Sequence, residues 1–562
     1  MLTVCDSCRA LDDLTEARRR IAEVTVRILS GADVCSGVIV SPSGHILTVA
    51  HGVHPEAGPV RVVSGTGDPH EATVLIHDQT ADVALLQCSK AEGDRPLEYL
   101  PMELKQPLQS NQLVLACGYP ARDRSLREGI LRTGSILLAD EQNVRTTCML
   151  TVGDSGGPLV NADGRLIGLH RQIGVGPHAN LHIPVTKAVQ AIRTALPDTE
   201  LAKLAALSKQ TRLLPDHLSL ADELHQKVMN RTVRLSQDDT GKTVVHGFMM
   251  SHSLVVTKLS ELDPTKPIRV HRVGVGGSDI QNAVLATVLR RDRTIDMAVL
   301  RLDEELAIDE SSLPLSVESG VVGDLVFAFS STTHRAITNG SEKLVPLNSS
   351  KAQPKPLQVI AGIIGRAAFD EPSAKPRLGI VLDEKHKTGS MAVENVLPSS
   401  AASEAGITVG DVLLQADDQL LDSPAALGLI LKSWQPGDRM TLQIRVAANG
   451  APDRTLTRNV QLKGDPSNQF EKTEFLDGRA GAVSSRRTGF QQVMQIDAAV
   501  EPEDCGTVVV SPDGELIGLV IARRSRESTL VLPMATVSES VAKAETSADH
   551  PMTAPSLGTP QE

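Results

Sequence analysis

The feature that most constrains the fold of this chain is a repeat that spans most of its length. Residues 153–169 read GDSGGPLVNADGRLIGL, and residues 503–519 read EDCGTVVVSPDGELIGL. EARRRIAEVTVRIL at 16–29 is answered by ELHQKVMNRTVRLS at 223–236, and HDQTADVALLQC at 77–88 by RDRTIDMAVLRL at 291–302. Repetition of several phrases in one order predicts two copies of a whole module.

Length and composition set limits on the class of protein. A chain of 562 residues is too long for one hydrophobic core, so we expect three or four domains. The hydrophobic content of 41% and the charged content of 22% are typical of globular domains. A net charge of −12 disfavours nucleic acid or an anionic membrane as the main partner.

The termini and the cysteines bear on compartment and cofactors. No apolar run is long enough to cross a bilayer, and the first twenty residues carry acidic groups that a secretory signal lacks. As written, the chain is predicted to be cytoplasmic; a start codon assigned too far downstream would instead fit the periplasm or cell envelope. Seven scattered cysteines do not suggest a disulfide framework, and the single C-x-x-C of Cys5 and Cys8 is too small for zinc, so we expect no metal and no cofactor.

The first copy of the repeat carries the residue types of a serine nucleophile site. CSGVIVSPSGHILTVAHGV, at 35–53, has the pattern of a hairpin and places His51 just beyond a strand. Asp82 precedes a buried-strand pattern, and Ser155 lies in a Gly-rich loop. A serine hydroxyl needs a neutral imidazole to take its proton and a carboxylate to orient that imidazole. We therefore assign Ser155 as nucleophile, His51 as general base and acid, and Asp82 as orienting group, with the amides of Gly153 and Ser155 as the oxyanion hole.

These phrases also carry a resemblance. ILTVAHGV, TADVALLQ, GDSGGPLVNADGRLIGL and LHIPVTKAV occur in the order and roughly the spacing of the HtrA group of trypsin-like serine proteases, over about residues 20 to 195. The resemblance implies two six-stranded β-barrels with the three residues in the cleft between them. It also implies a specificity pocket at Met149 and Leu150, which would favour small or medium apolar P1 residues. The alternative is a fold retained without activity.

Two features of the first copy allow more than one interpretation. Asp154 stands where HtrA proteins usually have Asn and matches the GDSGGP form of digestive proteases, whose Asp pairs with a newly cut N-terminal amine. Arg20 and Ile21 would be the corresponding cleavage point, but the run RRRIAEV also fits an ordinary amphipathic helix. His170 and His182 could approach the specificity pocket or be structural groups.

The second copy lacks part of this chemistry. Aligning Thr257 with Thr48 puts Ser260 in the place of His51, whereas Asp296 keeps the place of Asp82. Cys505 matches Ser155, but Glu503 replaces Gly153, the expected source of an oxyanion amide. A cysteine nucleophile would need a neighbouring base or cation and a working oxyanion hole. We therefore interpret the second copy as a degenerate, inactive repeat; a cysteine protease centred on Cys505 is the alternative.

The second copy is interrupted by a segment that resembles a PDZ domain of the protease-associated type. Its pattern is PSSAASEAGITVGDV at 398–412. A PDZ domain binds a C-terminal peptide as an added strand and holds the carboxylate with loop amides. The resemblance implies that Arg377, Leu378, Gly379 and Ile380 form that loop and that a helix over 423–434 forms the opposite wall. The alternative is a PDZ fold used as a spacer.

The sequence therefore predicts a mainly β protein with two tandem trypsin-like double β-barrel modules and a PDZ (α+β) domain inserted in the second. The expected parts are an N-terminal segment 1–20, an active protease domain 21–195, a helical connector 196–222, a first part of the degenerate domain 223–370, the PDZ domain 375–463, the remainder of the degenerate domain 470–542, and a disordered tail 543–562.

The predicted function is that of an HtrA-like serine endopeptidase in protein quality control, acting through an acyl-enzyme on Ser155. Its expected partners are unfolded or tagged polypeptides and C-terminal peptides at the PDZ domain. No nucleic acid is expected, and a homo-oligomer is left open. The alternative is a non-catalytic peptide-binding scaffold or holdase with vestigial protease folds.

Overall fold

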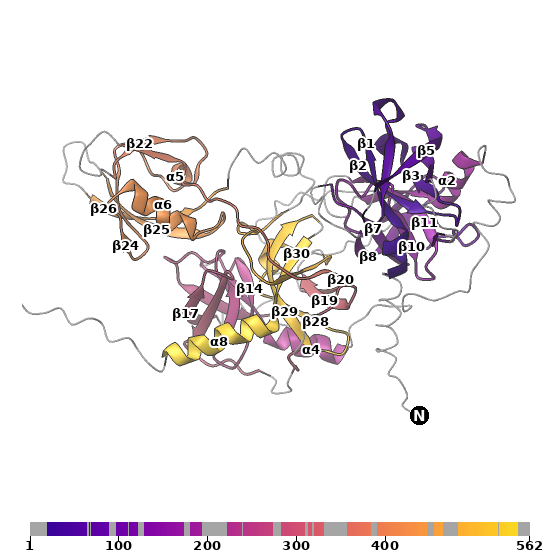
Figure 1. Cartoon of the computed structure of the whole chain (residues 1–562). Helices are drawn as coiled ribbons and strands as arrows, with labels where there is room; N and C mark the ends of the chain where they lie inside the picture. Colours follow the sequence, from indigo (N-terminus) through magenta and orange to yellow (C-terminus); the bar gives the residue numbers. More distant parts are fainter. Residues whose placement is uncertain are drawn as a thin grey trace, which may run out of the picture.

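The polypeptide is organised around four β-barrels. The computed structural model describes residues 19–548, apart from 65–66, 68, 89–96, 111, 122–128, 174–179, 194–221, 239, 274–282, 309–312, 317–319, 331–356, 384–390, 447–453, 465–481, 499 and 527. Within these residues the strands form four closed six-stranded barrels and a smaller unit with two open sheets. The barrels lie in two consecutive pairs, and the smaller unit lies at the far end of the second pair (Figure 1). The mainly β architecture predicted from the sequence is confirmed.

The first pair of barrels, the first module, spans residues 25–184 and is followed by a helix. Its first barrel has the hydrogen-bonded order β1 (Thr25–Ser30), β2 (Asp33–Ile39), β3 (His45–Thr48), β6 (Val83–Cys88), β5 (Pro69–Asp78) and β4 (Val60–Val63). Its second barrel has the order β10 (Pro158–Asn161), β11 (Leu166–Ile173), β12 (Asn180–Pro184), β9 (Val144–Thr146), β8 (Ile130–Ala139) and β7 (Leu113–Gly118).

The second pair of barrels, the second module, repeats both strand orders. The third barrel runs β13 (Thr232–Ser236), β14 (Val245–Met249), β15 (Leu254–Lys258), β18 (Met297–Leu302), β17 (Val284–Asp292) and β16 (Ile268–Arg272). The fourth runs β19 (Leu325–Ser330), β20 (Gln358–Phe369), β27 (Val493–Ile496), β30 (Ser528–Pro533), β29 (Leu516–Ser525) and β28 (Val508–Val510). The internal repeat of the sequence is therefore a repeat of topology.

The smaller unit, which we call the inserted unit, lies between β20 and β27. It contains the pair β21 (Ile380–Leu382) and β22 (Val393–Val396), and a sheet of β24 (Gln419–Leu420), β23 (Val412–Ala416), β25 (Arg439–Val446) and β26 (Arg454–Gln461). Two helices, α5 (Ala401–Glu404) and α6 (Pro424–Lys432), pack in its own apolar core. The hydroxyl of Ser423 caps α6 by accepting from Ala426 N, so this helix begins where the sequence predicted it. The chain thus leaves the fourth barrel, forms a separate core and returns.

Helices connect and close the modules. A short helix at 19–24 leads into β1, α2 (Val185–Ile192) follows β12, α4 (Asp222–Arg231) leads into β13, and α8 (Met534–Ala548) follows β30. The expected tail from 543 is wrong at its start, because α8 continues to Ala548 and Ala544 is buried against the core. Residues 1–18, most of the expected connector at 196–222, and the end of the tail at 549–562 lie outside the described residues, as do Cys5 and Cys8.

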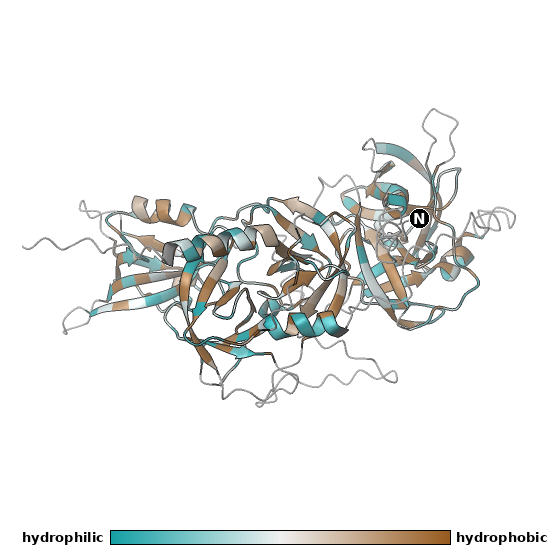
Figure 2. Cartoon of the chain, turned by 90° about the horizontal axis from the view of Figure 1, so that it is seen from below, coloured by the Kyte–Doolittle hydropathy of each residue, from teal (hydrophilic) through white to brown (hydrophobic). Residues whose placement is uncertain are grey.

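The barrel interiors are filled by aliphatic side chains. Figure 2 shows hydrophobic residues concentrated along the strands. Because the chain has only 2% aromatic residues, Val, Leu and Ile make up most of the buried core. The fully or nearly fully buried phenylalanines, Phe248, Phe327, Phe329 and Phe490, all lie in the second module. None of the described helices combines the length and the apolar character needed to cross a membrane.

Arg486 joins the inserted unit to the second module. Its guanidinium is 2% exposed and pairs with Asp438 of the inserted unit, with Nη1 3.0 Å from Oδ1. It also donates to the backbone carbonyls of Arg293 and Gly489 in the second module. Arg293 in turn stacks over Trp434, with 4.2 Å between the guanidinium carbon and the ring centroid. A single buried cation therefore connects three segments that are distant in sequence.

Replacing Arg486 with Met should lower the free energy of unfolding by about 3–5 kcal/mol, because the Asp438 carboxylate would remain buried without its counter-charge. The measurement is the urea midpoint at about pH 8, where Asp438 is ionised even though burial raises its pKa to about 6. Arg301→Met, on the exposed face of β18, is the matched control and should change stability by less than about 0.5 kcal/mol. Equal midpoints for the two variants would contradict a structural role for the buried cation.

Candidate active site

His51 and Asp82 meet at the end of the first barrel. His51 lies in the 3-10 turn Ala50–Gly52 that follows β3, and Asp82 stands just before β6 with a left-handed backbone, φ +58°. The Nδ1 atom of His51 lies 3.0 Å from both carboxylate oxygens of Asp82, and its backbone N–H donates to Oδ1 at 3.1 Å. The Asp82 carboxylate thus fixes both the ring and the backbone of His51. The His51 side chain is 49% exposed, which leaves its other ring nitrogen open to a reactant.

The environment of Asp82 favours its ionised form. Burial by itself would raise the pKa of Asp82, but hydrogen bonds from the side chain and backbone of His51, with the charges of His51 and Arg171, bring the pKa below its ordinary value. Arg171, on β11, places its Nε 3.3 Å from Asp82 Oδ2 and its Nη1 3.3 Å from Asn143 Oδ1. Arg171 could not be predicted from the sequence, because nothing in its strand pattern separates it from a surface arginine.

Ser155 lies in a tight loop between the two barrels of the first module. Gly153 has φ +101°, and a Cβ there would lie 2.3 Å from Ala121 N and 2.5 Å from Tyr119 O. Gly156 has φ +86°, and a Cβ would lie 2.1 Å from Thr48 Oγ1. Only glycine fits these two positions. Ser155 is partly exposed and, among the described residues, makes no hydrogen bond with His51, a contact that in free enzymes often tightens only with substrate.

Two amides beside Ser155 are available for a ligand. Among the described residues, no acceptor is bonded to the backbone N–H of Gly153 or Ser155, whereas Asp154, Gly156 and Gly157 donate to Thr151 O, His170 O and Asp154 O. Ser36 fixes the same loop: its N–H donates to Ser155 O at 2.8 Å, and its hydroxyl donates to Gly153 O at 2.8 Å. The loop is held by its carbonyls and leaves these two donors open, as an oxyanion hole requires.

Asp154 is paired with an arginine inside the protein. Its Oδ2 lies 2.9 Å from Arg132 Nη1 and accepts from Thr151 N at 2.8 Å, and both charged side chains have no exposed surface. Ile21 is also fully buried, and its carbonyl accepts a hydrogen bond from Thr25 Oγ1 at 2.6 Å. Arg132 on β8 therefore occupies the place that a newly cut N-terminal amine was considered for, and the amphipathic-helix interpretation of 19–24 is confirmed.

The residues considered for the specificity pocket are all buried. Met149 and Leu150 are each 2% exposed, so neither presents much surface to a substrate side chain. His170 and His182 face one another with 3.0 Å between their Nδ1 atoms, and His182 Nε2 lies 2.8 Å from Thr146 Oγ1. Burial lowers the pKa of His182 to about 3 and that of His170 well below its usual range. The two imidazoles are therefore neutral structural groups.

The matching site of the second module has the same backbone geometry as the first but lacks the imidazole base. Asp296 has φ +56° and accepts from Ser260 N at 2.7 Å, as Asp82 does from His51 N. Ser260 Oγ donates to Asp296 Oδ2 at 2.8 Å, and the fully buried Lys258 ammonium also pairs with that carboxylate. An ion pair replaces the imidazole, so this carboxylate has no base to orient.

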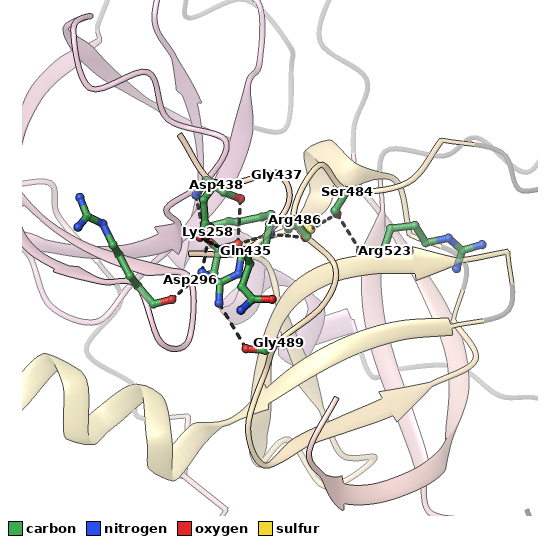
Figure 3. A network of polar contacts seen from close by, with 12 residues as sticks. Lys258, Asp296, Gln435, Gly437, Asp438, Ser484, Arg486, Gly489 and Arg523 are labelled. Atoms are coloured by element: carbon green, nitrogen blue, oxygen red, sulfur yellow. Dashed lines mark hydrogen bonds and ion pairs between the residues drawn. The ribbon is translucent and has the colours of Figure 1, made fainter. Parts of the chain in front are cut away.

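Cys505 is inaccessible at the position of Ser155. It is fully buried, its Sγ lies 3.5 Å from Ser484 Oγ, and its amide donates to Pro502 O at 3.3 Å. Burial raises the pKa of the thiol to about 11, against the smaller lowering effects of Lys258 and Ser484. Figure 3 shows Ser484, the neighbour of this thiol, in the same polar network as Arg486, Lys258, Asp296 and Asp438. A thiol in this position is protonated and covered.

The loop expected to bind a peptide carboxylate begins the inserted unit. Arg377 pairs with Lys463 through backbone hydrogen bonds, and Gly379 has φ +78° with Ser400 packed against it. The side chain of Leu378 is 3% exposed and belongs to the core, while Ile380 starts β21 opposite Val396. Among the described residues no acceptor is bonded to the backbone N–H of Leu378 or Gly379. The loop therefore has the donors that a carboxylate would need.

The buried histidine pair predicts a pH dependence of stability. Because the pKa of each imidazole is lower in the folded state than its unfolded value of about 6.5, the unfolded chain binds protons as the pH falls, and stability decreases by up to about 1.4 kcal/mol per pH unit per histidine. The melting temperature of the first module should therefore fall between about pH 7.5 and pH 5. His182→Asn should make this slope shallower. His70→Gln, at a partly exposed histidine of β5, should leave it unchanged; identical slopes for all three proteins would contradict the account.

Comparison with known proteins agrees with the geometry of the first module. Residues 35–169 match the family of trypsin-like peptidase domains. Mitochondrial serine protease HTRA2 of Bos taurus is 36% identical over 143 residues, which are 24% of this chain and 30% of that protein. Serine protease HTRA1B of Danio rerio is 26% identical over 301 residues, 52% of this chain and 59% of that protein. The matches thus cover from about a third to about three-fifths of these relatives.

A solved structure, the serine endoprotease from Yersinia pestis, also matches over 80% of this chain and 98% of that one, at 16% identity and a TM-score of 0.28. This similarity is too low to define the fold, which rests on the barrels themselves. The sequence match and the closed barrels together lead to one conclusion about the first module. Residues 35–169 form a trypsin-like peptidase domain similar to those of the HtrA serine proteases.

Proposed function

We propose that this chain is a serine endopeptidase that cleaves polypeptides through an acyl-enzyme on Ser155. The observation that supports this most strongly is the combination of a bidentate His51–Asp82 contact with two open amides at Gly153 and Ser155. An imidazole without the amides could act only as a general base, and the open amides without the imidazole could only bind an anion. Acyl transfer by a serine requires a general base on one side of the hydroxyl and an oxyanion hole on the other.

In the proposed reaction, Ser155 Oγ attacks the scissile carbonyl carbon while its proton moves to His51 Nε2. The carbonyl oxygen becomes an oxyanion and is held by the N–H groups of Gly153 and Ser155, donors whose loss costs about 10²–10³ in rate. The imidazolium is stabilised by Asp82, which the contact with Arg171 helps to keep ionised. His51 then protonates the leaving amine, and a water molecule deprotonated by His51 hydrolyses the acyl-enzyme.

The second module is proposed to be catalytically inactive. Its position equivalent to His51 carries Ser260, and its carboxylate Asp296 is neutralised by Lys258. Cys505 is buried, and its pKa is raised to about 11, so the thiolate form that would act as a nucleophile is absent near neutral pH. The cysteine protease alternative therefore finds no support in this site.

The inserted unit is proposed to be a PDZ-type domain that binds C-terminal peptides. Support comes from the loop Arg377 to Ile380, with its open amides at Leu378 and Gly379 and a left-handed glycine. The helix α6 lies in the same small core as this loop. The substrates are proposed to be unfolded or C-terminally tagged polypeptides, in protein quality control. A peptide-binding scaffold without catalysis remains the competing function and is separated from the enzyme by one experiment.

That experiment is digestion of unfolded casein by the intact chain and by two single variants. Ser155→Ala should lower the rate of casein cleavage by at least about 10³-fold, because no other group in the site is a nucleophile. Cys505→Ala should leave the rate unchanged within about twofold, as expected for a buried, protonated thiol. Cleavage that is absent in the wild type would favour the scaffold, and cleavage that survives in Ser155→Ala but not in Cys505→Ala would assign catalysis to the second module.

A further inference from the structure

Asp497 is a carboxylate of the second module that bonds to the first. It follows β27 of the fourth barrel and is only 6% exposed. Its Oδ1 accepts from Ile363 N of β20 at 2.7 Å. Its Oδ2 accepts from the backbone N–H of Thr133 and, at 3.3 Å, from the Thr133 hydroxyl, both on β8 of the first module. One side chain therefore joins strands of two different barrels.

The segment of β8 that Asp497 holds is the segment next to the Ser155 loop. Arg132, which precedes Thr133, forms the buried ion pair with Asp154, and Asp154 is the residue before Ser155. Burial raises the pKa of Asp497 to about 6, while the bonds from Ile363 and Thr133 and the charge of Arg132 act to lower it. The charge of Arg132, which is paired with Asp154, therefore also favours the ionised form of Asp497.

The same strand also contacts residues 147–149, the segment that ends at Met149. Ser135 N donates to Thr147 Oγ1 at 2.9 Å, and Thr147 N donates to Ser135 O at 3.0 Å, two residues before Met149. A Cβ at Gly134 would lie 2.6 Å from Cys148 N, so β8 and the 147–149 segment are in close contact. A shift of β8 would thus be transmitted both to Asp154 and to the segment that leads to Met149.

The two modules are in direct contact at this point. A Cβ at Gly365 of β20 would lie 3.4 Å from Ile130 Cγ2 of β8, and within the second module a Cβ at Gly362 would lie 2.8 Å from Asp497 Oδ1. Burying a carboxylate costs free energy unless hydrogen bonds compensate for the lost water, and here three donors face it. Apolar side chains would be enough to hold the two modules together. A carboxylate that accepts directional hydrogen bonds also fixes the position of β8 relative to β20.

We infer that the second module positions the active-site loop of the first, with Asp497 as a positioning residue that holds β8 and, through the Arg132–Asp154 ion pair, the amides of Gly153 and Ser155. This inference rests on the proposed serine chemistry. The inactive second module then has a role without a catalytic site of its own, because it helps to hold the oxyanion hole of the first module in place.

The test is steady-state cleavage of a fluorogenic peptide by the full chain carrying Asp497→Asn. The replacement is nearly isosteric, but it turns an N–H group toward either Thr133 N or Ile363 N, both of which are donors. We expect kcat to fall about tenfold or more, because sub-ångström displacement of preorganised donors weakens transition-state binding, while KM changes by less than about twofold.

Asn180→Ala is the matched control, because Asn180 Oδ1, on β12, accepts from Arg526 Nη2 at 2.9 Å across the same pair of modules. Its kcat should stay within about twofold of the wild type. Thr133→Val, which removes only the longer bond, should give an intermediate fall and serves if Asp497→Asn does not fold.

Each outcome has one interpretation. An unchanged kcat in Asp497→Asn, an equal loss in Asn180→Ala, or a loss that lies in KM alone would overturn the positioning role. If Asp497→Asn does not fold, an unchanged kcat in Thr133→Val would overturn it as well. A wild-type chain that neither cleaves the peptide nor reacts with a fluorophosphonate at Ser155 would instead overturn the proposed function.

Discussion

The arrangement of the first module depends on the buried ion pair between Arg132 and Asp154. Two charges with no exposed surface are costly to desolvate, and removal of one partner from such a pair typically costs about 3–5 kcal/mol. The pair ties β8 of the barrel wall to the residue before Ser155. With Ser36 bonded to the carbonyls on either side, the loop has little freedom left, and its two open amides are preorganised before any substrate binds.

Comparison of the two modules shows which polar groups accompany the serine site. Strand register places Ile360, Val520 and Val531 of the second module where the first has Arg132, His170 and His182. All three replacements are buried and apolar, and Asp504, the counterpart of Asp154, accepts a hydrogen bond from the Ser330 hydroxyl. The second module therefore keeps the barrels and the loop but has apolar residues in place of Arg132, His170 and His182. At the position of the His51–Asp82 contact it has the Lys258–Asp296 pair, and Arg486 close by pairs with Asp438 of the inserted unit (Figure 3).

The sequence predicted what is local and periodic. Alternating and continuous apolar runs located the strands, the repeat located the second pair of barrels, and residue spacing brought His51 and Asp82 together at loops beside strand ends. It could not find Arg132, Arg171, Ser36 or Asp497, because each acts across a distance in sequence and each has a residue type common on surfaces. The last turns of α8 were predicted to be disordered because residues from 543 onward have few large apolar side chains. Only the structure shows that Ala544 is buried against the core.

The most direct test of the central claim is a crystal structure of the full chain after reaction with a peptidyl phosphonate ester, which becomes a stable tetrahedral adduct on an activated serine. The account predicts a covalent bond from phosphorus to Ser155 Oγ, with one phosphonyl oxygen within about 3 Å of both Gly153 N and Ser155 N and His51 Nε2 hydrogen-bonded to the adduct. An adduct on Cys505 or on another residue, or a Ser155 adduct whose oxygen points away from these amides, would contradict it.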